Sequence, residues 1–127
     1  LRALDELIIP ALRRAQPQIL VVSAGYDGHA TDPLAQHELT CDGYYQIMLR
    51  LRQAAEELCE GRLCVVLEGG YEPQALAHGV ENTALALLGE PLREPDATLP
   101  EVHPLATERV DDALGQIIEI HTTRLAL

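Results

Sequence analysis

Hydrophobic residues recur along this chain with two spacings, one typical of helices and one typical of buried strands. In segments 1–15, 41–60 and 73–88 the apolar positions lie three or four residues apart, which predicts three amphipathic helices. Between them stand two short runs, QILVVSAG and LCVVL, that are apolar on both alternating faces. Strands of that kind are covered on both sides, as in a parallel sheet. The order helix, strand, helix, strand, helix predicts half of a doubly wound α/β layer.

Single residues mark where the predicted helices begin, bend and end. Pro10 falls inside the first helical pattern and should kink or restart that helix. Thr40 can cap the second helix and Gly61 can end it. Pro73 suits the first turn of the third helix, which Gly89 follows. The apolar faces expected to enter the core are Leu1, Leu4, Leu7, Ile8 and Leu12; Tyr44, Ile47, Met48, Leu51, Ala55 and Leu58; and Leu76, Val80, Ala84, Leu87 and Leu88.

The last part of the chain has a different character. Four of the eight prolines fall in residues 91–106, which predicts an extended connector. Beyond it, a last amphipathic helix is predicted by the spacing of Val110, Leu114, Ile117, Ile118, His121 and Leu125. We therefore divide the chain into residues 1–90, a proline-rich connector over 91–106 and a C-terminal helix over 107–127.

Composition narrows the classes of function. Nine Lys and Arg against 20 Asp and Glu give a net charge of −11, which argues against a nucleic-acid partner because nucleic acids need a basic patch. The same charge is compatible with a cationic substrate. No apolar run approaches the roughly 20 residues that cross a bilayer, and no signal peptide is visible, so we expect no membrane partner. Three cysteines without a C-x-x-C pair favour a reduced, cytoplasmic setting.

Two loops are candidates for chemistry, because SAGYD follows the first predicted strand and LEGGY ends the second. Ligands of open parallel sheets collect beyond the carboxyl ends of the strands, so Asp27 and Tyr71 face one crevice if the strands are neighbours. A carboxylate there suits a metal ligand or a general base, and a phenol can donate a hydrogen bond to a developing oxyanion. An aspartate after a strand is also a common turn or cap residue, and the Gly69–Gly70 pair is common in turns. Spacing alone leaves both interpretations open.

The segments VVSAGYDGHATDPLAQHELTCDGYYQIM and GRLCVVLEGGYEPQALAHGV resemble the C-terminal part of the histone deacetylase superfamily. The similarity is strongest to the bacterial class II-like deacetylases, a group that includes acetylpolyamine amidohydrolases and acetoin-utilisation proteins. It covers about residues 1 to 90, roughly the last third of the usual catalytic domain. The resemblance implies the C-terminal part of an arginase/deacetylase-like, three-layer αβα fold with a mostly parallel sheet.

The resemblance also implies a role for each residue that matches its motifs. Asp27 matches an aspartate that binds the catalytic zinc ion, and Tyr71 matches the tyrosine that hydrogen-bonds the substrate carbonyl and its tetrahedral oxyanion. Leu34 matches a residue that lines the acyl-lysine channel. Gly69 and Gly70 match the backbone of the wall that carries the tyrosine. The implied reaction is zinc-dependent hydrolysis of the acetyl amide of acetyl-lysine or of an acetylated polyamine-type substrate.

Asp32 matches a commonly acidic loop position, which we interpret as structural, a cap or tie for the loop. The family takes two further zinc ligands from an Asp-x-His motif and its acid/base pair from adjacent histidines. Both normally lie upstream, and we assign neither to this chain. A catalytic zinc site usually has three protein ligands, of which this segment would contribute one.

The chain therefore looks like a piece of a longer protein, and its missing partner would be the N-terminal part of the catalytic domain. We expect the isolated chain to bind zinc weakly and to be inactive. The alternative is a non-catalytic α/β module for assembly or dimerisation. Two strands that are apolar on both faces, with only a few helices, should leave uncovered core and free strand edges. We therefore expect the isolated chain to self-associate, as a homodimer for example.

Overall fold

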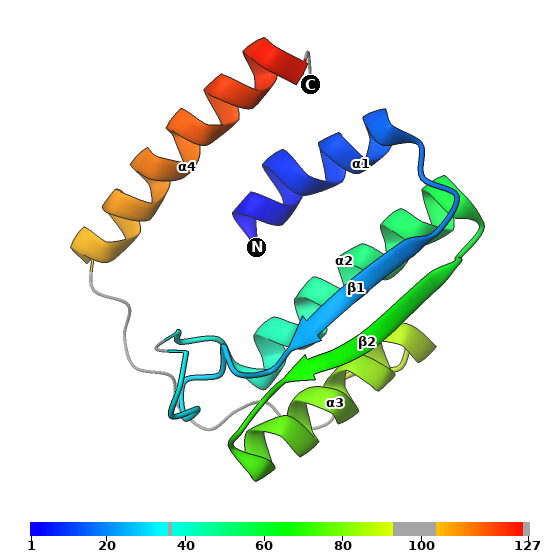
Figure 1. Ribbon diagram of the computed structural model, residues 1–127, viewed down its shortest axis with the longest axis vertical. Coiled ribbons are helices and arrows are strands. Elements are labelled where there is room, and N and C mark those ends of the chain that lie inside the picture. Colours follow the sequence, from blue (N-terminus) through cyan, green and yellow to red (C-terminus); the bar gives the residue numbers. More distant parts are fainter. Residues whose placement is uncertain (36, 93–103, 126–127) are drawn as a thin grey trace.

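Helices and strands alternate along the chain in the order that its hydrophobic pattern predicts. The computed structural model describes residues 1–35, 37–92 and 104–125. Figure 1 shows its two strands side by side, with α2 and α3 behind them. In chain order the elements are η1 (Leu4–Ile8, a π-helical turn), α1 (Ile9–Ala15), β1 (Leu20–Gly25), α2 (Cys41–Cys59), β2 (Leu63–Gly69), α3 (Pro73–Leu88) and α4 (Pro104–Leu125). The chain therefore has the predicted α/β fold.

β1 and β2 pair in parallel, and α2 connects them. Leu20 lies opposite Leu63, the register continues unbroken to Ala24, and it then shifts by one residue so that Gly25 lies opposite Gly69. Two parallel strands joined by a crossover end at the same edge of their sheet. The loops that follow β1 and β2 therefore leave the sheet at one edge, which the interpretation of SAGYD and LEGGY required.

The core lies between one face of the sheet and the helices. Thr40 caps α2 as predicted, because its Oγ1 accepts a hydrogen bond from Gly43 N at 2.8 Å. Glu60 and Gly61 adopt left-handed conformations where α2 ends. Two clusters of buried residues form the core: Leu4, Ile9, Leu20, Ala54, Ala55 and Cys59, and beside them Tyr45, Met48, Leu85 and Ala86.

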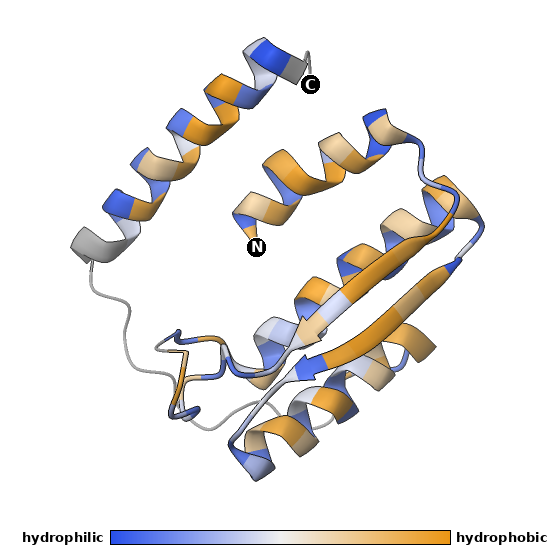
Figure 2. Ribbon diagram, in the orientation of Figure 1, coloured by the Kyte–Doolittle hydropathy of each residue, from blue (hydrophilic) through white to orange (hydrophobic). Residues whose placement is uncertain are grey.

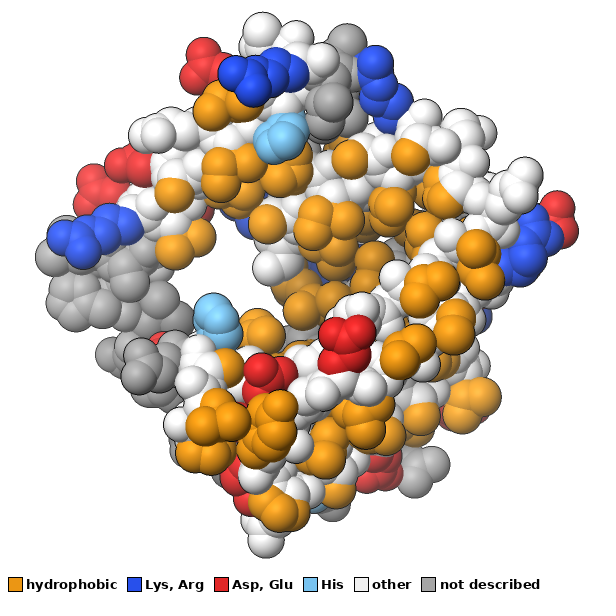
Figure 3. All heavy atoms as spheres, in the orientation of Figure 1, with side chains coloured by type: hydrophobic (Ala, Val, Ile, Leu, Met, Phe, Trp, Pro, Cys, Tyr) orange, Lys and Arg blue, Asp and Glu red, His pale blue; other side chains and the backbone are white. Residues whose placement is uncertain are grey.

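The opposite face of the sheet is open in the described part of the chain. Val21 is 63% exposed and Val66 is 46% exposed. Hydrophobic residues run along both strands (Figure 2), and hydrophobic side chains are visible over them in the space-filling view (Figure 3). The strands were expected to be covered on both faces, but the helices that pack on this sheet cover only one. Each strand also has one edge without a strand neighbour among the described residues.

The first helix differs from the prediction at one turn. Leu4–Ile8 forms a π-helical turn, in which the amide of Ile9 donates to the carbonyl of Leu4. This wider turn brings Ile9 rather than Ile8 to the side of Leu4, so Ile9 is buried and Ile8 is 45% exposed. The chain stays helical across Pro10, because the wider turn before it accommodates a residue that lacks an amide proton and has a bulky ring.

The buried face of α3 is also different from the predicted one. Val80, Leu87 and Leu88 were expected in the core but are exposed. A repeat of apolar positions does not reveal which of two apolar faces meets the core, and here the face of small residues does so. The exposed side borders an open groove of about 260 Å³ that Leu67 also lines. The residues that α3 buries are Ala75, Gly79, Asn82, Thr83, Leu85 and Ala86.

α4 contacts the rest of the described chain mainly through η1. An ion pair joins Arg2 Nη1 to Asp111 Oδ1 at 2.6 Å, and Leu114 is buried. The helix overlaps the C-terminal helix that was predicted over residues 107–127, and it begins at Pro104. Most of the predicted connector lies outside the described residues, so the three-part division of the chain stays a prediction. Among the described helices, none combines the length and apolar character needed to cross a membrane.

Tyr26, the residue after β1, anchors the end of that strand to the helices. Its buried ring lies directly on Gly79 of α3, and its hydroxyl donates to Thr83 Oγ1 at 2.8 Å. The ring of Tyr44, on α2, lies against it with the two centroids 5.0 Å apart. One aromatic side chain therefore holds the start of the first candidate loop against both α2 and α3.

We expect Gly79→Ala to destabilise the fold, although replacing glycine by alanine inside a helix ordinarily stabilises it by about 0.5–1 kcal/mol. A Cβ at residue 79 would stand 2.5 Å from Tyr26 Cδ1, so the ring or α3 must move. Overpacking of this kind typically costs about 1–3 kcal/mol in the free energy of unfolding. Gly115→Ala in α4, where a Cβ meets no atom within 4 Å, should instead be stabilising. Urea denaturation of both variants measures the difference, and shifts of the same sign would contradict it.

Candidate functional site

The two candidate loops start from hydrogen-bonded strand ends. Tyr26 N donates to Gly69 O at 2.8 Å, so the contact between the two segments continues one residue beyond β1. Asp27 follows immediately, and Tyr71 lies two residues after Gly69. The structure thus brings both segments to one edge of the sheet, where the sequence analysis expected them.

The Asp27 carboxylate lies across the ends of both strands. A Cβ at either Gly25 or Gly69 would stand 2.5 Å from Asp27 Oδ1, so a side chain at either position would displace this carboxylate. Gly69 was assigned only to the wall that carries Tyr71, and the structure adds this contact with Asp27. Gly25 is a residue that the sequence interpretation missed, although its place in SAGYD was an available signal. The pair of glycines leaves the half-buried carboxylate room at the rim of the sheet.

Gly70 needs the conformational freedom of glycine. Its φ of +133° lies in a region that side chains disfavour. A Cβ there would also stand 2.9 Å from Leu76 Cδ1 and 3.1 Å from Tyr26 Cβ. This turn leads the chain from β2 to Tyr71, whose backbone then meets the other loop.

Asp32 joins the two loops. Its Oδ1 accepts a hydrogen bond from Leu34 N at 2.9 Å, and its Oδ2 accepts one from Tyr71 N at 2.7 Å. Burial of the Asp32 side chain pushes its pKa up, but the backbone amides of Leu34, Tyr71 and Glu72 outweigh that effect and hold the pKa below its usual value. The carboxylate is therefore ionised at neutral pH and ties the two loops together, as the sequence interpretation proposed for its own loop.

The side chains of Tyr71 and Leu34 project outward from this framework. Tyr71 is 58% exposed and Leu34 is 64% exposed, so neither is enclosed by the described part of the chain. A hollow of about 370 Å³ has Glu72 in its wall, but neither Tyr71 nor Leu34 lines it. The other residues that line it are His29, Thr31, Cys41, Gln74, Ala75 and His78.

Tyr44 approaches the Asp27 loop from α2. A Cβ at Gly28 would stand 2.9 Å from the Tyr44 hydroxyl oxygen, which shows how closely that oxygen meets the loop. Burial of the phenol, and after it the negative charge of Asp27, raises the pKa of Tyr44 to about 12. The phenol is therefore neutral at physiological pH. The sequence analysis placed Tyr44 only on the apolar face of its helix, because the spacing of apolar residues does not show what a tyrosine hydroxyl contacts.

Metal donors are few at this edge. Among the described residues, no three His, Cys, Asp or Glu side chains are grouped to hold a metal ion. The chain does contain one Asp-x-His order, Asp27–Gly28–His29, which the sequence interpretation did not count. His29 Nδ1 lies 2.9 Å from Thr31 Oγ1 and accepts the Thr31 amide at 3.2 Å, so this imidazole nitrogen engages its own loop. Asp27 is a single hard oxygen donor, which fits one position of a zinc site whose other ligands come from elsewhere.

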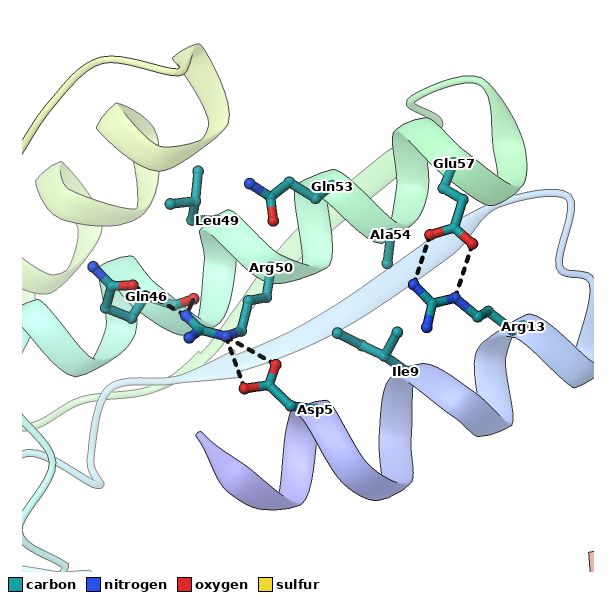
Figure 4. Close-up of a pocket in the computed structure, with 9 residues that line it drawn as sticks. All are labelled: Asp5, Ile9, Arg13, Gln46, Leu49, Arg50, Gln53, Ala54 and Glu57. Carbon is teal, nitrogen blue, oxygen red and sulfur yellow. Dashed lines mark hydrogen bonds and ion pairs between the residues drawn. The ribbon is translucent and has the colours of Figure 1, made fainter. Parts of the chain in front are cut away.

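A larger hollow, of about 540 Å³, lies between α1 and α2 rather than at the strand edge (Figure 4). Arg50 pairs there with Asp5 at 2.9 Å, and Arg13 pairs with Glu57 at 2.8 Å. These charges neutralise one another across the hollow, and exposed ion pairs of this kind contribute little to stability. No residue of the two candidate loops lines this hollow, so we do not assign it to the site.

Known proteins share this combination of sequence and fold. Residues 1–87 match the family model of the histone deacetylase domain. Histone deacetylase 10, chloroplastic, of Oryza sativa subsp. japonica is 41% identical over 123 residues, which cover 94% of this chain and 27% of that protein. The histone deacetylase-like amidohydrolase of Pseudomonas aeruginosa is 44% identical over 71 residues, 56% of this chain and 19% of that protein. The solved structure of the histone deacetylase Clr3 matches with a TM-score of 0.67 and 25% identity, over 87% of this chain and 18% of that one.

The chain spans less than a third of the length of each of these relatives, because the matched segments cover 27%, 19% and 18% of them. Their similarity therefore concerns one segment of a larger domain. The two candidate loops belong to that segment, since residues 20–71 lie inside the range that the family model matches.

We expect Gly25→Ala to weaken metal binding more than it weakens folding, because a Cβ at residue 25 would displace the Asp27 carboxylate from the strand ends. If Asp27 ligates a metal ion in the full-length protein, the metal affinity should fall about 10- to 100-fold, the usual range when the surroundings of a metal ligand are changed. Competition with a chromophoric chelator measures this affinity. Gly115→Ala, which adds its methyl group in open space, should leave it unchanged. A folded Gly25→Ala protein with normal affinity would argue against Asp27 as a ligand.

Proposed function

Because this chain belongs to the histone deacetylase family, we propose that it is the C-terminal segment of a zinc-dependent deacetylase that hydrolyses the acetyl amides of acetyl-lysine or of acetylated polyamine-type amines. One observation carries the proposal. β1 and β2 are paired and parallel, so Asp27 and Tyr71 follow strand ends at a single edge of the sheet. An edge of this kind is where open α/β sheets bind ligands.

Two residues of this chain would have direct roles at the site, one as a zinc ligand and one as a hydrogen-bond donor to the substrate. Asp27 would supply one of the protein ligands of zinc, in the space that Gly25 and Gly69 leave for its carboxylate. When bound, zinc lowers the pKa of its water and polarises the acetyl carbonyl. Tyr71 would donate a hydrogen bond to the carbonyl oxygen as negative charge develops on it. The remaining zinc ligands and the histidine that accepts the water proton would come from outside these 127 residues.

Substrate contacts follow from the same loops. Leu34 is exposed and apolar, which suits a lining for the methylene stem of an acyl-lysine side chain. Gly69 and Gly70 would form the adjoining wall through their backbone. The net charge of −11 favours an amine substrate or product over an anionic one. The three cysteines form no disulfide among the described residues, which supports a reducing compartment, and for this we propose the cytoplasm. Cell fractionation would test this, since the rice relative carries a chloroplast designation.

A non-catalytic assembly module is the second candidate, and the open face of the sheet favours it. Val21 and Val66 are largely exposed there, and exposed apolar surface on a strand is typical of a site that binds another chain. The two candidates differ in what precedes Leu1 in the gene product. An Asp-x-His motif and adjacent histidines upstream support the enzyme, whereas their absence from the whole product would support the module.

In the full-length protein, we expect Tyr71→Phe to lower kcat about 100- to 1000-fold, the range for losing one oxyanion donor. The phenyl ring keeps the shape of the side chain but cannot donate a hydrogen bond, so zinc content should not change. Hydrolysis of an acetyl-lysine peptide measures kcat, and Asp27→Ala should remove both zinc and activity. Tyr45→Phe is the matched control, because its hydroxyl donates to Glu90 O away from the two loops and should not affect kcat. A Tyr71→Phe enzyme of full activity would refute the assigned role.

The isolated 127-residue chain should be inactive. One carboxylate cannot hold zinc by itself, so dialysis should leave far less than one zinc per chain, measured by elemental analysis. The uncovered sheet face should also make the chain self-associate, which sedimentation at high concentration would detect. Stoichiometric zinc, hydrolysis of an acetyl-lysine peptide, or a monodisperse monomer would each contradict one part of this expectation.

A further inference from the structure

Asp32 is a buried acid whose two oxygens serve two different loops. It is 9% exposed, and it accepts hydrogen bonds from Leu34 N in its own loop and from Tyr71 N in the loop that follows β2. Leu34 follows two residues later, in an Asx-type turn, whereas Tyr71 lies 39 residues away in the chain. A carboxylate used in this way fixes the distance between the segments that carry the two side chains.

We propose that Asp32 is a positioning residue for the deacetylation described above, holding the Tyr71 backbone so that the exposed phenol meets the substrate carbonyl. The proposal rests on the proposed function. Tyr71 is held at its base by β2, where Gly69 O accepts the Tyr26 amide at 2.8 Å. The bond to Asp32 adds a second fixed point directly at the Tyr71 amide. Catalysis is sensitive to such placement, because an error of about 1 Å can cost roughly 100-fold in rate.

The loop that carries Asp32 is held by its own backbone hydrogen bonds, so it can hold the Asp32 carboxylate in one position. Its backbone closes on itself through Asp32 N to His29 O at 2.9 Å, Ala30 N to Leu39 O at 2.9 Å and Leu39 N to Gly28 O at 3.0 Å. The last two bonds connect the start of the loop with the turn before α2. Asp32 therefore fixes the Tyr71 segment relative to the segment that carries Asp27.

Only an ionised carboxylate satisfies both amides at once. Asp32 Oδ1 accepts the Leu34 N–H and Oδ2 accepts the Tyr71 N–H, whereas an asparagine has a single acceptor oxygen and would turn its NH2 group toward the other amide. Asp32→Asn keeps the size of the side chain, and its one acceptor oxygen should stay with Leu34 N in the local Asx-type turn and release Tyr71 N. Asp32→Ser is shorter, so its hydroxyl can keep the local turn to Leu34 N but cannot reach Tyr71 N.

A double-mutant cycle in the full-length protein separates positioning from general stability. We expect Asp32→Asn to lower kcat for an acetyl-lysine peptide about 10- to 100-fold, with zinc content unchanged. In a Tyr71→Phe background the same change should lower kcat less than about 3-fold, because the phenol that Asp32 positions is already gone. Glu38→Gln, in an exposed side chain of the same loop, is the matched control and should not affect kcat. Equal effects of Asp32→Asn in both backgrounds would overturn the proposal.

Amide hydrogen exchange gives a readout that does not depend on activity. In zinc-free full-length protein, the Tyr71 amide should exchange at least about 10-fold faster in Asp32→Asn than in the wild type, while the Gly43 amide bound to Thr40 should not change. Should Asp32→Asn fail to fold, Asp32→Ser serves instead: faster exchange of the Tyr71 amide supports the tie, and exchange at the wild-type rate overturns it. A wild-type protein without deacetylase activity would refute the proposed function, yet unchanged Tyr71 exchange in Asp32→Asn would refute the tie separately.

Discussion

The parallel pairing of β1 with β2 is the constraint on which the rest of the structure depends. α2 carries the chain back across the sheet, so both strands run in one direction and end at one edge. The hydrogen bond from Tyr26 N to Gly69 O closes that edge after the regular register has shifted. This hydrogen bond places Asp27 and Tyr71 near each other at the sheet edge, because each lies within two residues of one of its partners.

The candidate site depends on side chains that lie very close to glycine backbones more than on any single strong interaction. The Asp27 carboxylate occupies space that any side chain at Gly25 or Gly69 would fill, and the Tyr26 ring occupies space above Gly79. These glycines are needed for room rather than for an unusual backbone, whereas Gly70 also needs its positive φ. A site built from such contacts tolerates little change in the residues around it, even where those residues take no part in chemistry.

The open sheet face connects the fold with both functional candidates. A segment of a larger catalytic domain and an assembly module both require that Val21 and Val66 be covered, and they differ only in whether the cover is the same polypeptide or another chain. Family membership favours the first, because this chain spans less than a third of the relatives that it matches. The arrangement of Asp32 is compatible with either, since its hydrogen bonds lie entirely within the described loops.

Much of the fold was predictable from the sequence because its signals are local. Thr40 acts through its side chain on the next turn, Gly61, Pro73 and Gly89 act through their own backbone, and all four stand where helices begin or end. The apolar runs identified both strands, and the SAGYD and LEGGY loops identified one edge. The sequence alone did not reveal the π-helical turn before Pro10 or the face of α3 that meets the core, because both depend on which neighbour packs against the helix.

The same distinction holds at the site. The sequence by itself determined that an aspartate and a tyrosine follow two strands, and the resemblance of its motifs to the deacetylases supplied their expected roles. Only the tertiary structure decided that Gly25 makes room for Asp27, that the Tyr44 hydroxyl closely approaches the Gly28 backbone, and that Asp32 reaches the Tyr71 amide. Those contacts join residues from separate elements, and their distances are set by how the helices pack on the sheet, which no local pattern encodes.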